Sequence, residues 1–304
     1  MTMIDIAVVG AGTAGMTAAI YGRRAGMEVT VFEGNTYGGQ IVATPEVENF
    51  PGFEKISGFD LADSIFRQAM ALDAKFVFDQ INSIEKKEDG FVLTGDFGNE
   101  YEAKTVIIAT GATNRHLGID REEELVGHGI SYCATCDGAF FKDKVTAVAG
   151  GGNTAVEDAL YLAGLCSKVY IIHRREGFRA EEALMVKARQ TENIEILTPY
   201  VTERLEGDGR LSSVVLKNAV DGSEKTIEVD GLFVAIGQVP ATKAVEGLVG
   251  MEGGYIKAGE DCVTSCPGVF VAGDVRTKHV RQLATAASDG AIAALAAVSC
   301  IKMQ

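Results

Sequence analysis

Short apolar runs alternate along the chain with glycine-rich turns and with longer segments in which apolar and polar positions mix. Residues 4–9 and 29–32 have the length and composition of buried strands. Between them, we predict a helix that follows the turn at residues 10–15 and ends near Gly26. Strands that alternate with helices in this way are typical of an α/β fold built on a parallel sheet.

The same order of elements occurs a second time in the middle of the chain. Apolar runs at residues 145–149 and 169–172 enclose a second glycine-rich turn and a helix predicted to end near Leu165. The residue that closes the second strand is Glu33 in one copy and His173 in the other, each 23 positions after the first glycine of its turn. Two framed copies are a far more specific signal than one, and they predict two similar nucleotide-binding units.

Both turns follow the Gly-x-Gly-x-x-Gly/Ala pattern of dinucleotide-binding proteins. The glycines keep the turn tight and let the backbone approach a pyrophosphate, while the N-terminus of the next helix offers free N–H groups to that anion. The turn residues expected to contact a dinucleotide are Gly10, Gly12, Thr13, Ala14 and Gly15 in the first copy and Gly150, Gly152, Asn153, Thr154 and Ala155 in the second.

The residue that closes each second strand should lie beside the adenosine ribose. Glu33 can accept hydrogen bonds from ribose hydroxyls, and its charge would repel a 2′-phosphate. His173 is instead followed by Arg174 and Arg175, with Arg179 close behind. Guanidinium groups suit the 2′-phosphate of NADP, so we expect the second copy to prefer NADPH. A purely solvated role for these arginines is the alternative.

Composition narrows the class of protein. The 304 residues are 47% apolar and 23% charged, as in an ordinary soluble globular protein, and suffice for about two domains. The net charge of −14 argues against binding to nucleic acid or to anionic lipid. The longest apolar stretch, residues 291–301, is about half a membrane span and is interpreted as a buried helix. No secretory signal precedes the first strand, so we expect a cytoplasmic protein.

Two of the six cysteines form a Cys-x-x-Cys motif ahead of the second turn. Cys133 and Cys136 are followed directly by Asp137. In a reducing compartment this spacing indicates redox chemistry or a metal site. A zinc site would need two more ligands, for which Cys262 and Cys266 are the only candidates at a comparable spacing, so we expect no metal.

Together these features resemble the two-dinucleotide-binding flavoproteins, and within them the low-molecular-weight, bacterial-type thioredoxin reductases. Three more apolar strands that end in or near glycine, at residues 106–111, 232–237 and 270–275, add to the likeness, which runs nearly end to end. The motifs that carry it are Gly38-Gly39-Gln40, Glu48-Asn49-Phe50-Pro51-Gly52, Cys133-Ala134-Thr135-Cys136-Asp137-Gly138, His173-Arg174-Arg175-Glu176-Gly177-Phe178-Arg179 and Arg281-Gln282. Thr13 and His128 depart from it, because the family commonly has Pro and a basic Arg or Lys at these two places.

The resemblance implies two Rossmann-like domains. A discontinuous FAD-binding domain, residues 1–113 and 242–304, would contain an inserted NADP-binding domain, residues 114–241, with hinges at the two crossings. Beyond the first turn and Glu33, the resemblance assigns to FAD the residues Gly39, Gln40, Asn49, Thr110, Gly111, Gly273, Asp274, Arg281, Gln282 and Leu283. Beyond the second turn and the segment from His173 to Arg179, it assigns Ile236 and Gly237 to NADP.

The resemblance also implies a function, the NADPH-dependent reduction of thioredoxin through FAD and a Cys133–Cys136 disulfide. Cys133 would attack the substrate disulfide, Cys136 would face the flavin and Asp137 would carry a proton. Because the pair and the NADP site share one domain, that domain would rotate between half-reactions.

The expected partners are thioredoxin, or a similar small dithiol protein, and a second copy of the chain in a homodimer. The resemblance places His128, Phe140 and Phe141 in the docking surface. Two alternatives stay open. One is a reductase of another small redox protein, such as a glutaredoxin-like or peroxidase-coupled carrier. The other is a non-catalytic flavin redox sensor, which would have no use for Arg174 and Arg175.

Overall fold

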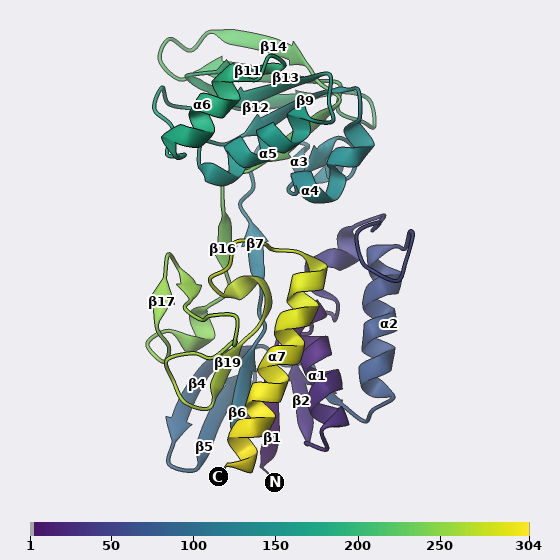
Figure 1. The fold of residues 1–304 in the computed structure, drawn as a ribbon, viewed down its shortest axis with the longest axis vertical. Coiled ribbons are helices and arrows are strands. Elements are labelled where there is room, and N and C mark those ends of the chain that lie inside the picture. The colour runs from purple at the N-terminus through teal and green to yellow at the C-terminus, as the bar shows by residue number, and fades with distance from the viewer. Residues whose placement is uncertain (1–2, 304) are drawn as a thin grey trace. The chain divides into compact units, whose positions relative to one another are not determined.

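The computed structural model describes residues 3–303, which fold into two compact units. The first unit combines Met1–Thr113 with Val239–Gln304, and the second is Asn114–Gln238. The chain crosses between them along two short strands that pair with each other, β7 (Ala112–Asn114) and β16 (Gln238–Pro240) (Figure 1). The second boundary lies at Val239, slightly before the predicted residue 242.

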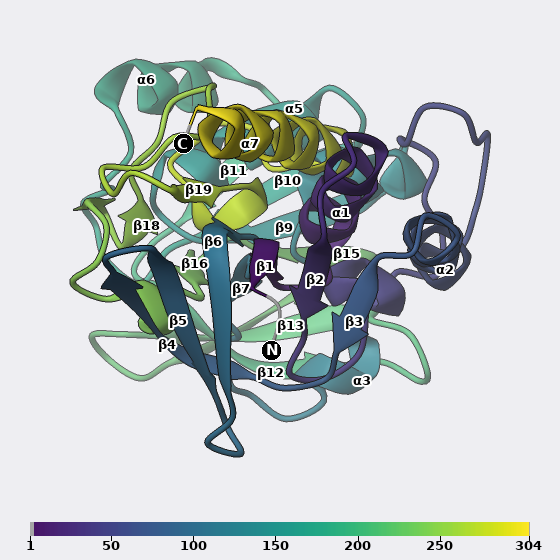
Figure 2. The same cartoon turned by 90° about the horizontal axis from the view of Figure 1, so that it is seen from below.

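The first unit is built on a seven-stranded sheet in the order β3-β2-β1-β6-β5-β4, with β19 also paired to β6. The strands are parallel except at the antiparallel pairs β4–β5 and β5–β6, and helices α1 and α7 lie side by side on one face (Figure 2). Apart from the crossing strands, the elements of this unit are β1 (Ile4–Val9), α1 (Thr13–Arg24), β2 (Val29–Phe32), a 3-10 turn η1 (Gly39–Ala43), α2 (Gly58–Met70), β3 (Lys75–Val77), β4 (Ile81–Lys87), β5 (Gly90–Gly95), β6 (Glu100–Ile108), η3 (Lys243–Val245), β17 (Met251–Glu252), β18 (Tyr255–Ile256), β19 (Val269–Val271), η4 (Gly273–Val275) and α7 (Leu283–Lys302).

The second unit has three layers. A five-stranded parallel sheet, in the order β11-β10-β9-β15-β8, packs one face against helices α5 and α6 and the other against an antiparallel sheet of β12, β13 and β14. Its elements are α3 (Glu122–Leu125), β8 (Ile130–Ser131), α4 (Ala134–Asp137), η2 (Gly138–Phe141), β9 (Val145–Ala149), α5 (Asn153–Ala163), β10 (Lys168–Ile172), α6 (Glu182–Gln190), β11 (Ile194–Leu197), β12 (Tyr200–Glu206), β13 (Ser213–Asn218), β14 (Glu224–Glu228) and β15 (Gly231–Val234).

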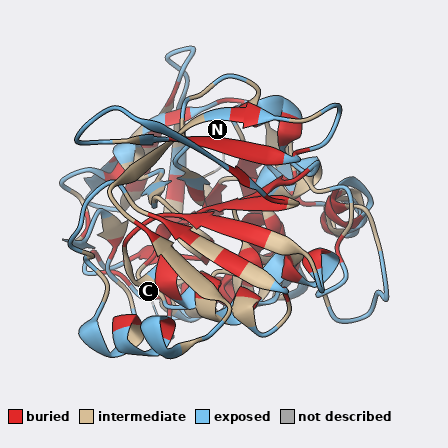
Figure 3. Cartoon of the chain, turned by 90° about the horizontal axis from the view of Figure 1, so that it is seen from above, coloured by how far each residue is buried: buried red, intermediate tan, exposed pale blue. Residues whose placement is uncertain are grey.

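The central strands are buried on both faces, which explains why they are continuous apolar runs (Figure 3). In β1, Ile6 and Val8 face the helices α1 and α7, whereas Ala7 and Val9 belong to the core on the other side of the sheet. The predicted repeat is present as β1–α1–β2 and β9–α5–β10. In each copy the glycine-rich turn lies at the carboxyl end of a parallel strand, where ligands of such sheets bind.

Helix α7 corrects one expectation from the sequence. It spans 20 residues and, by length and composition alone, could cross a membrane, although no segment was expected to be long enough. Ala293, Ala294 and Ala297 are fully buried beside α1, and a Cβ on Gly290 would collide with the carbonyl oxygen of Ala14. These small residues let the two helices approach closely, so α7 is a core helix of the first unit.

Candidate functional site

The first glycine-rich turn connects β1 to α1. Two of its glycines are required by the protein itself, because a Cβ on Gly10 would collide with the carbonyl of Ala109 and a Cβ on Gly15 with that of Gly10. Gly12 differs, since no atom lies within 4 Å of the place where its Cβ would be. Gly12 is also the N-cap of α1 and offers no side-chain cap. The turn therefore leaves both space and uncapped N–H groups, which a pyrophosphate requires.

Glu33 closes β2 beside this turn. Its carboxylate accepts hydrogen bonds from the main-chain N–H groups of Ala11, at 2.9 Å, and Asn35, at 3.1 Å. These contacts hold the carboxylate at the edge of the turn, where an adenosine ribose is expected. Thr13 and Ala14 are buried in the first turn of α1.

Asp274 follows β19 and has a buried oxygen, Oδ1, that lacks a hydrogen-bond partner among the described residues. Burial raises the pKa of Asp274, and the charges of Lys278 and Arg281 oppose that effect. The Nε atom of Arg281 is buried and lacks a partner in the same sense, and its guanidinium lies over the ring of Tyr255, 4.4 Å from the centroid. Buried polar atoms are normally paired. An acceptor and a donor left open in this way fit a hydroxyl-rich ligand such as the ribityl chain of a flavin.

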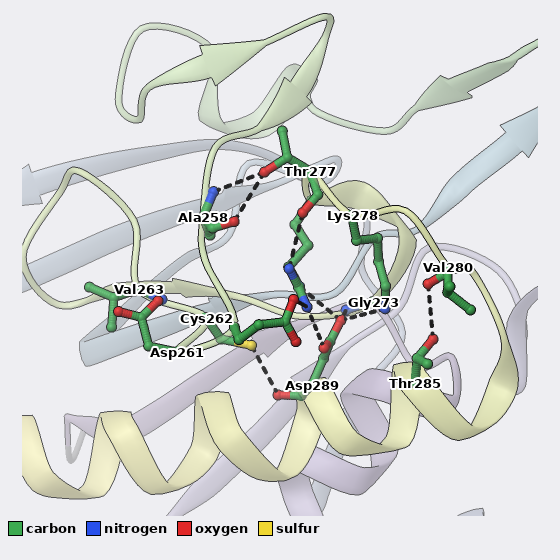
Figure 4. Close-up of polar contacts among 12 residues, drawn as sticks. Ala258, Asp261, Cys262, Val263, Gly273, Thr277, Lys278, Val280, Thr285 and Asp289 are labelled. Carbon is green, nitrogen blue, oxygen red and sulfur yellow. Dashed lines mark hydrogen bonds and ion pairs between the residues drawn. The ribbon is translucent and has the colours of Figure 1, made fainter. Parts of the chain in front are cut away.

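A buried ionic network holds the backbone in front of Asp274 (Figure 4). The carboxylate of Asp289, on α7, accepts from the main-chain N–H of Gly273 at 3.0 Å and from Lys278 Nζ at 2.8 Å. It also accepts two hydrogen bonds from Arg276. Asp289 thus ties η4 to α7, and it was not among the residues predicted from the sequence.

The start of α7 brings two predicted flavin ligands together. Gln282 is the N-cap of the helix and forms a capping box with Thr285, so that Leu283 is the first helical residue. The side-chain amide of Asn49 donates to Gln282 Oε1 at 3.3 Å. Residues from the two separate segments of the first unit therefore meet at this helix N-terminus.

The remaining predicted flavin ligands lie near the crossing strands of the first unit. Gln40 Nε2 donates to the carbonyl of Ala112, and Thr110 Oγ1 donates to the carbonyl of Ala241 at 2.6 Å. Gly39 begins η1, and Gly111 has a φ of 69°, which favours glycine. Contacts of these residues with FAD stay a prediction.

The second glycine-rich turn resembles the first in having one crowded glycine and one glycine beside open space. A Cβ on Gly150 would collide with the carbonyl of Ala235, whereas no atom lies within 4 Å of a Cβ on Gly152. Asn153 and Glu181 form a reciprocal pair, in which Asn153 Oδ1 accepts from the main chain of Glu181 at 2.9 Å and Asn153 Nδ2 donates to Glu181 Oε1 at 3.1 Å. Thr154 is exposed and Ala155 is buried in the first turn of α5.

The segment after β10 folds back onto this turn. The main-chain N–H of Arg179 donates to the carbonyl of Gly151 at 2.8 Å, and the ring of His173 fills the space where a Cβ on Gly151 would be. Arg174, Arg175 and Arg179 are all exposed. Burial and then the three guanidinium charges lower the pKa of His173, which favours its neutral form. An anion placed here would face arginines that are close to the turn.

Ile236 and Gly237, the other two predicted NADP ligands, follow the last strand of the parallel sheet, β15. The carbonyl of Gly237 accepts from the main-chain N–H of Arg115 at 2.9 Å, which fixes the end of the second unit to its beginning. Both residues therefore lie at the carboxyl edge of the sheet, on the same edge as the second turn.

Cys133 and Cys136 form a disulfide in the second unit. Cys133 is the N-cap of the short helix α4, and Cys136 lies within it. Cys133 is half-buried and Cys136 is exposed. The predicted pair is thus present in its oxidised form.

Asp137 is the last residue of α4 and lies beside the disulfide. Burial raises its pKa, and a hydrogen bond from the Ser131 hydroxyl to Oδ2, at 2.6 Å, opposes that effect in part. A carboxyl with a raised pKa can hold a proton closer to neutral pH, as a proton carrier requires.

The predicted docking surface needs one correction. Phe140 and His128 are exposed, but Phe141 is only 6% exposed. Its ring packs edge-on against Phe233, with 5.3 Å between the centroids, because Phe141 closes the 3-10 turn η2 over the core of the second unit. Phe141 therefore belongs to the core and is not part of a docking surface.

The other cysteines do not gather into a ligand set. Within residues 3–303 no group of three or more His, Cys, Asp or Glu side chains is arranged to hold a metal ion. Cys166, Cys262 and Cys266 are buried, and burial raises the pKa of Cys262 to about 12. Cys262 and Cys266 belong to the first unit, whereas the disulfide belongs to the second.

Three residues of the site were missed in the sequence, namely Asp289, Ser131 and Glu181. Asp289 is an acid in an otherwise apolar helix, which was a usable signal. Ser131 lies two residues before Cys133, but nothing in the sequence shows that its hydroxyl reaches Asp137. Glu181 is one of several acids on a polar stretch and gave no signal.

Comparison with known proteins identifies the family of the chain. Residues 4–291 match the family described as pyridine nucleotide-disulphide oxidoreductase. The thioredoxin reductase of Mycoplasma pneumoniae is 43% identical over 96% of this chain and 93% of its own length. The thioredoxin reductase of Listeria innocua is 45% identical over 95% of this chain and 91% of its own length.

Solved structures of thioredoxin reductases have the same fold as this chain. Thioredoxin reductase from Streptococcus pyogenes, 36% identical, has a TM-score of 0.94 over 99% of both chains. The enzyme from Giardia duodenalis, 35% identical, has a TM-score of 0.96 over 100% of both chains. Membership of this group implies a flavin and a nicotinamide nucleotide as cofactors. The chain therefore belongs to the pyridine nucleotide-disulphide oxidoreductases and, within them, to the low-molecular-weight thioredoxin reductases.

Proposed function

We propose that the chain takes electrons from NADPH, holds FAD in its first unit and reduces thioredoxin with the Cys133–Cys136 pair. The observation that carries the proposal is the place of the disulfide. It lies in the inserted unit, directly before Asp137, together with the nucleotide turn that faces an arginine cluster. A purely structural disulfide would need neither a half-buried acid beside it nor a nucleotide site in the same unit.

The choice of NADPH rests on Arg174, Arg175 and Arg179. Their exposed guanidinium groups follow β10 at the position of the adenosine ribose, and the main chain of Arg179 is anchored to the glycine turn. Charge-assisted hydrogen bonds from arginine suit a 2′-phosphate. Glu33 occupies the same position in the first unit and would repel one, so the phosphorylated nucleotide belongs to the second unit.

The choice of FAD for the first unit rests on the open space above Gly12 and on the unpaired polar atoms of Asp274 and Arg281. The glycine turn suits the pyrophosphate, and Asp274 would hold the ribityl chain. When bound, the flavin supplies the link between a hydride donor and a disulfide, which takes up an electron pair at sulfur.

The residues of the redox turn then have separate roles. Once the pair is reduced, the thiolate of Cys133 attacks one sulfur of the thioredoxin disulfide, forms a mixed disulfide and displaces the other sulfur as a thiolate. The thiolate of Cys136 next attacks the sulfur of Cys133, which restores the Cys133–Cys136 disulfide and releases the second substrate thiolate. Asp137 supplies one of the two protons that the product dithiol takes up, and water supplies the other.

The placement of the proposed sites on the two units implies that one unit moves relative to the other. The disulfide and the NADPH site share the second unit, and each in turn must reach a flavin held by the first. We infer that the inserted unit rotates about the crossing formed by β7 and β16. A covalent cross-link that fixes the units in one arrangement should stop turnover and leave one half-reaction intact. A cross-linked enzyme that still turns over would contradict the rotation.

Thioredoxin should dock on the second unit, over a surface that includes His128 and Phe140. A homodimer and a cytoplasmic location are further expectations from the family. Light scattering of the purified holoenzyme tests the first, and fractionation of the source cells tests the second.

Anaerobic titration of the holoenzyme with NADPH tests the whole proposal. NADPH should bleach the flavin band, and oxidised thioredoxin should restore it. Restoration by a different small dithiol protein, but not by thioredoxin, would change the substrate. A flavin band that NADPH does not bleach would make the chain a flavin-binding sensor instead of an enzyme.

A further inference from the structure

The hydroxyl of Ser131 is the point where the redox turn and Asp137 meet. Ser131 is the last residue of β8 and is 4% exposed. Its Oγ donates to Asp137 Oδ2 at 2.6 Å and accepts from the main-chain N–H of Cys133 at 3.0 Å. The carbonyl oxygen of Cys133 lies 3.3 Å from the same Oγ. One buried hydroxyl therefore contacts both ends of the redox turn.

A hydroxyl has one proton to donate and two lone pairs with which to accept. While Asp137 is ionised, the Ser131 proton points to the carboxylate and Oγ accepts from the N–H of Cys133. Once Asp137 carries a proton, its own O–H can donate to Oγ, and the Ser131 proton can turn to the carbonyl of Cys133. The hydrogen bonds are satisfied in both states without moving a heavy atom.

We propose that Ser131 is a positioning residue, whose hydroxyl holds the Asp137 carboxyl against the redox turn in both protonation states. It thereby couples proton movement at Asp137 to the backbone of Cys133. The inference deepens the proposed function and rests on it in one respect, the role of Asp137 as proton carrier.

The Ser131 hydroxyl is the polar group that opposes the effect of burial on the pKa of Asp137. Burial raises the pKa of Asp137, and the hydrogen bond from Ser131 lowers it. The elements that contact α4 are α5 and η2; the charged residues of α5 are Glu157 and Asp158, and Lys142 and Lys144 follow η2. None of the four contributes to the shift. Burial and the charge of Glu157 raise the pKa of Asp158 to about 7, so Asp158→Asn is needed to identify its share of any pH profile.

The experiment compares Ser131→Ala and Ser131→Thr in the holoenzyme. Two quantities are measured from about pH 5 to about pH 9, the rate of NADPH-driven disulfide reduction and the carbon-13 NMR titration of the Asp137 carboxyl. The alanine variant should move both to higher pH, because it removes a hydrogen bond that favours the ionised carboxyl. It should also lower the maximal rate about tenfold, because Asp137 is no longer held against the redox turn. Threonine keeps the hydroxyl and should restore both.

Ser167→Ala is the matched control. Ser167 lies in the same unit and its hydroxyl donates to the carbonyl of Lys144 at 2.9 Å, on the exposed surface. It should leave the rate and the titration unchanged. If Ser131→Ala fails to fold, Ser131→Val compared with Ser131→Thr supplies the same test, since the two side chains differ by a hydroxyl against a methyl group.

A double-mutant cycle with Asp137→Asn separates the possible results. If Ser131 acts through Asp137, adding Ser131→Ala to Asp137→Asn lowers the rate no further. Independent losses from the two changes, or an Asp137 titration that Ser131→Ala leaves in place, would overturn the inference. If Asp137→Asn alone leaves the rate unchanged, the proposed proton carrier is wrong, and the carboxyl titration still shows whether Ser131 holds it.

Discussion

Arg276 and Asp289 form a bidentate ion pair inside the first unit. Nε and Nη2 of Arg276 donate to the two carboxylate oxygens of Asp289 at 3.0 and 2.8 Å. Their side chains are only 2% and 3% exposed. Because the same carboxylate holds the N–H of Gly273, the ion pair fixes the backbone in front of Asp274. The proposed flavin site therefore depends on a buried ion pair that is not among the predicted flavin ligands.

Replacement of Asp289 should affect both stability and flavin binding. Asp289→Ala leaves Arg276 and Lys278 buried without their anion and should lower the free energy of unfolding by about 3–5 kcal/mol. FAD should also bind more weakly to the apoprotein. Urea unfolding and a fluorescence titration with FAD measure the two effects. Glu260→Gln is the control, because Glu260 contacts Arg276 at 3.3 Å but is 89% exposed, and equal losses in the two variants would refute the prediction.

The same network should give the protein an acid-sensitive component of stability. Burial alone would raise the pKa of Asp289, but the hydrogen bonds from Arg276 and Lys278 outweigh it, and the pKa is lowered. Such a carboxyl stabilises the fold above its unfolded pKa, and the stabilisation is lost as pH falls through the lowered value. The difference in unfolding free energy between wild type and Asp289→Asn should therefore shrink below about pH 4. A difference that stays constant down to the acid limit of folding would count against this.

The glycines of the first turn should separate folding from ligand binding. The methyl group added by Gly12→Ala would contact no protein atom, so the melting temperature of the apoprotein should not change. FAD affinity should fall about tenfold or more, because the methyl group would occupy the space expected for the pyrophosphate. Gly15→Ala collides with the backbone of Gly10 and should destabilise the apoprotein itself. Thermal unfolding without FAD, followed by FAD titration, distinguishes the two. Gly12→Ala protein that binds FAD normally would show that the pyrophosphate lies elsewhere.

The arginine cluster should decide between the two nicotinamide nucleotides. Arg174→Ala combined with Arg175→Ala removes charge-assisted hydrogen bonds and should raise the KM for NADPH about 30-fold or more, with little change for NADH. Steady-state kinetics with both nucleotides measure the effect. Arg189→Ala is the control, because Arg189 pairs with Glu182 on the surface of α6. Equal losses for NADPH and NADH would remove the 2′-phosphate assignment.

The two cysteines should be distinguishable by trapping. Cys136→Ser leaves Cys133 able to attack but removes the thiol that resolves the mixed disulfide, so a stable adduct with thioredoxin should accumulate. Non-reducing electrophoresis and mass spectrometry identify the adduct and its linkage. Cys133→Ser is the reciprocal control and should form none. An adduct through Cys136 in that control would reverse the two roles.

The nucleotide-binding units could be predicted from the sequence because their signals are local. The strand Ile4–Val9 has the bounds expected from its apolar run, and Gly10 ends it where the chain must turn tightly. The positions of Glu33 and His173 follow from the same spacing in both copies. In such units, the strand, the turn and the following helix are each specified by neighbouring residues.

Other features depend on how distant segments meet. The helix α7 proved longer than its apolar core suggested, because Gly290 and Asp289 interrupt the apolar run without interrupting the helix. Phe140 and Phe141 are neighbours of the same type, and only the packing of η2 decides which one is buried. The contact of Ser131 with Asp137 likewise requires a strand end and a short helix to converge.

The insertion of one unit into the other also fixes the order in which the protein can be completed during synthesis. The first unit cannot close until β19 pairs with β6 and α7 covers α1, and both elements come from the last segment of the chain. The second unit is contiguous, so all of its strands leave the ribosome earlier. The unit that carries the disulfide can thus be finished while the N-terminal strands still lack their cover, which leaves the apolar residues of those strands open to misassembly.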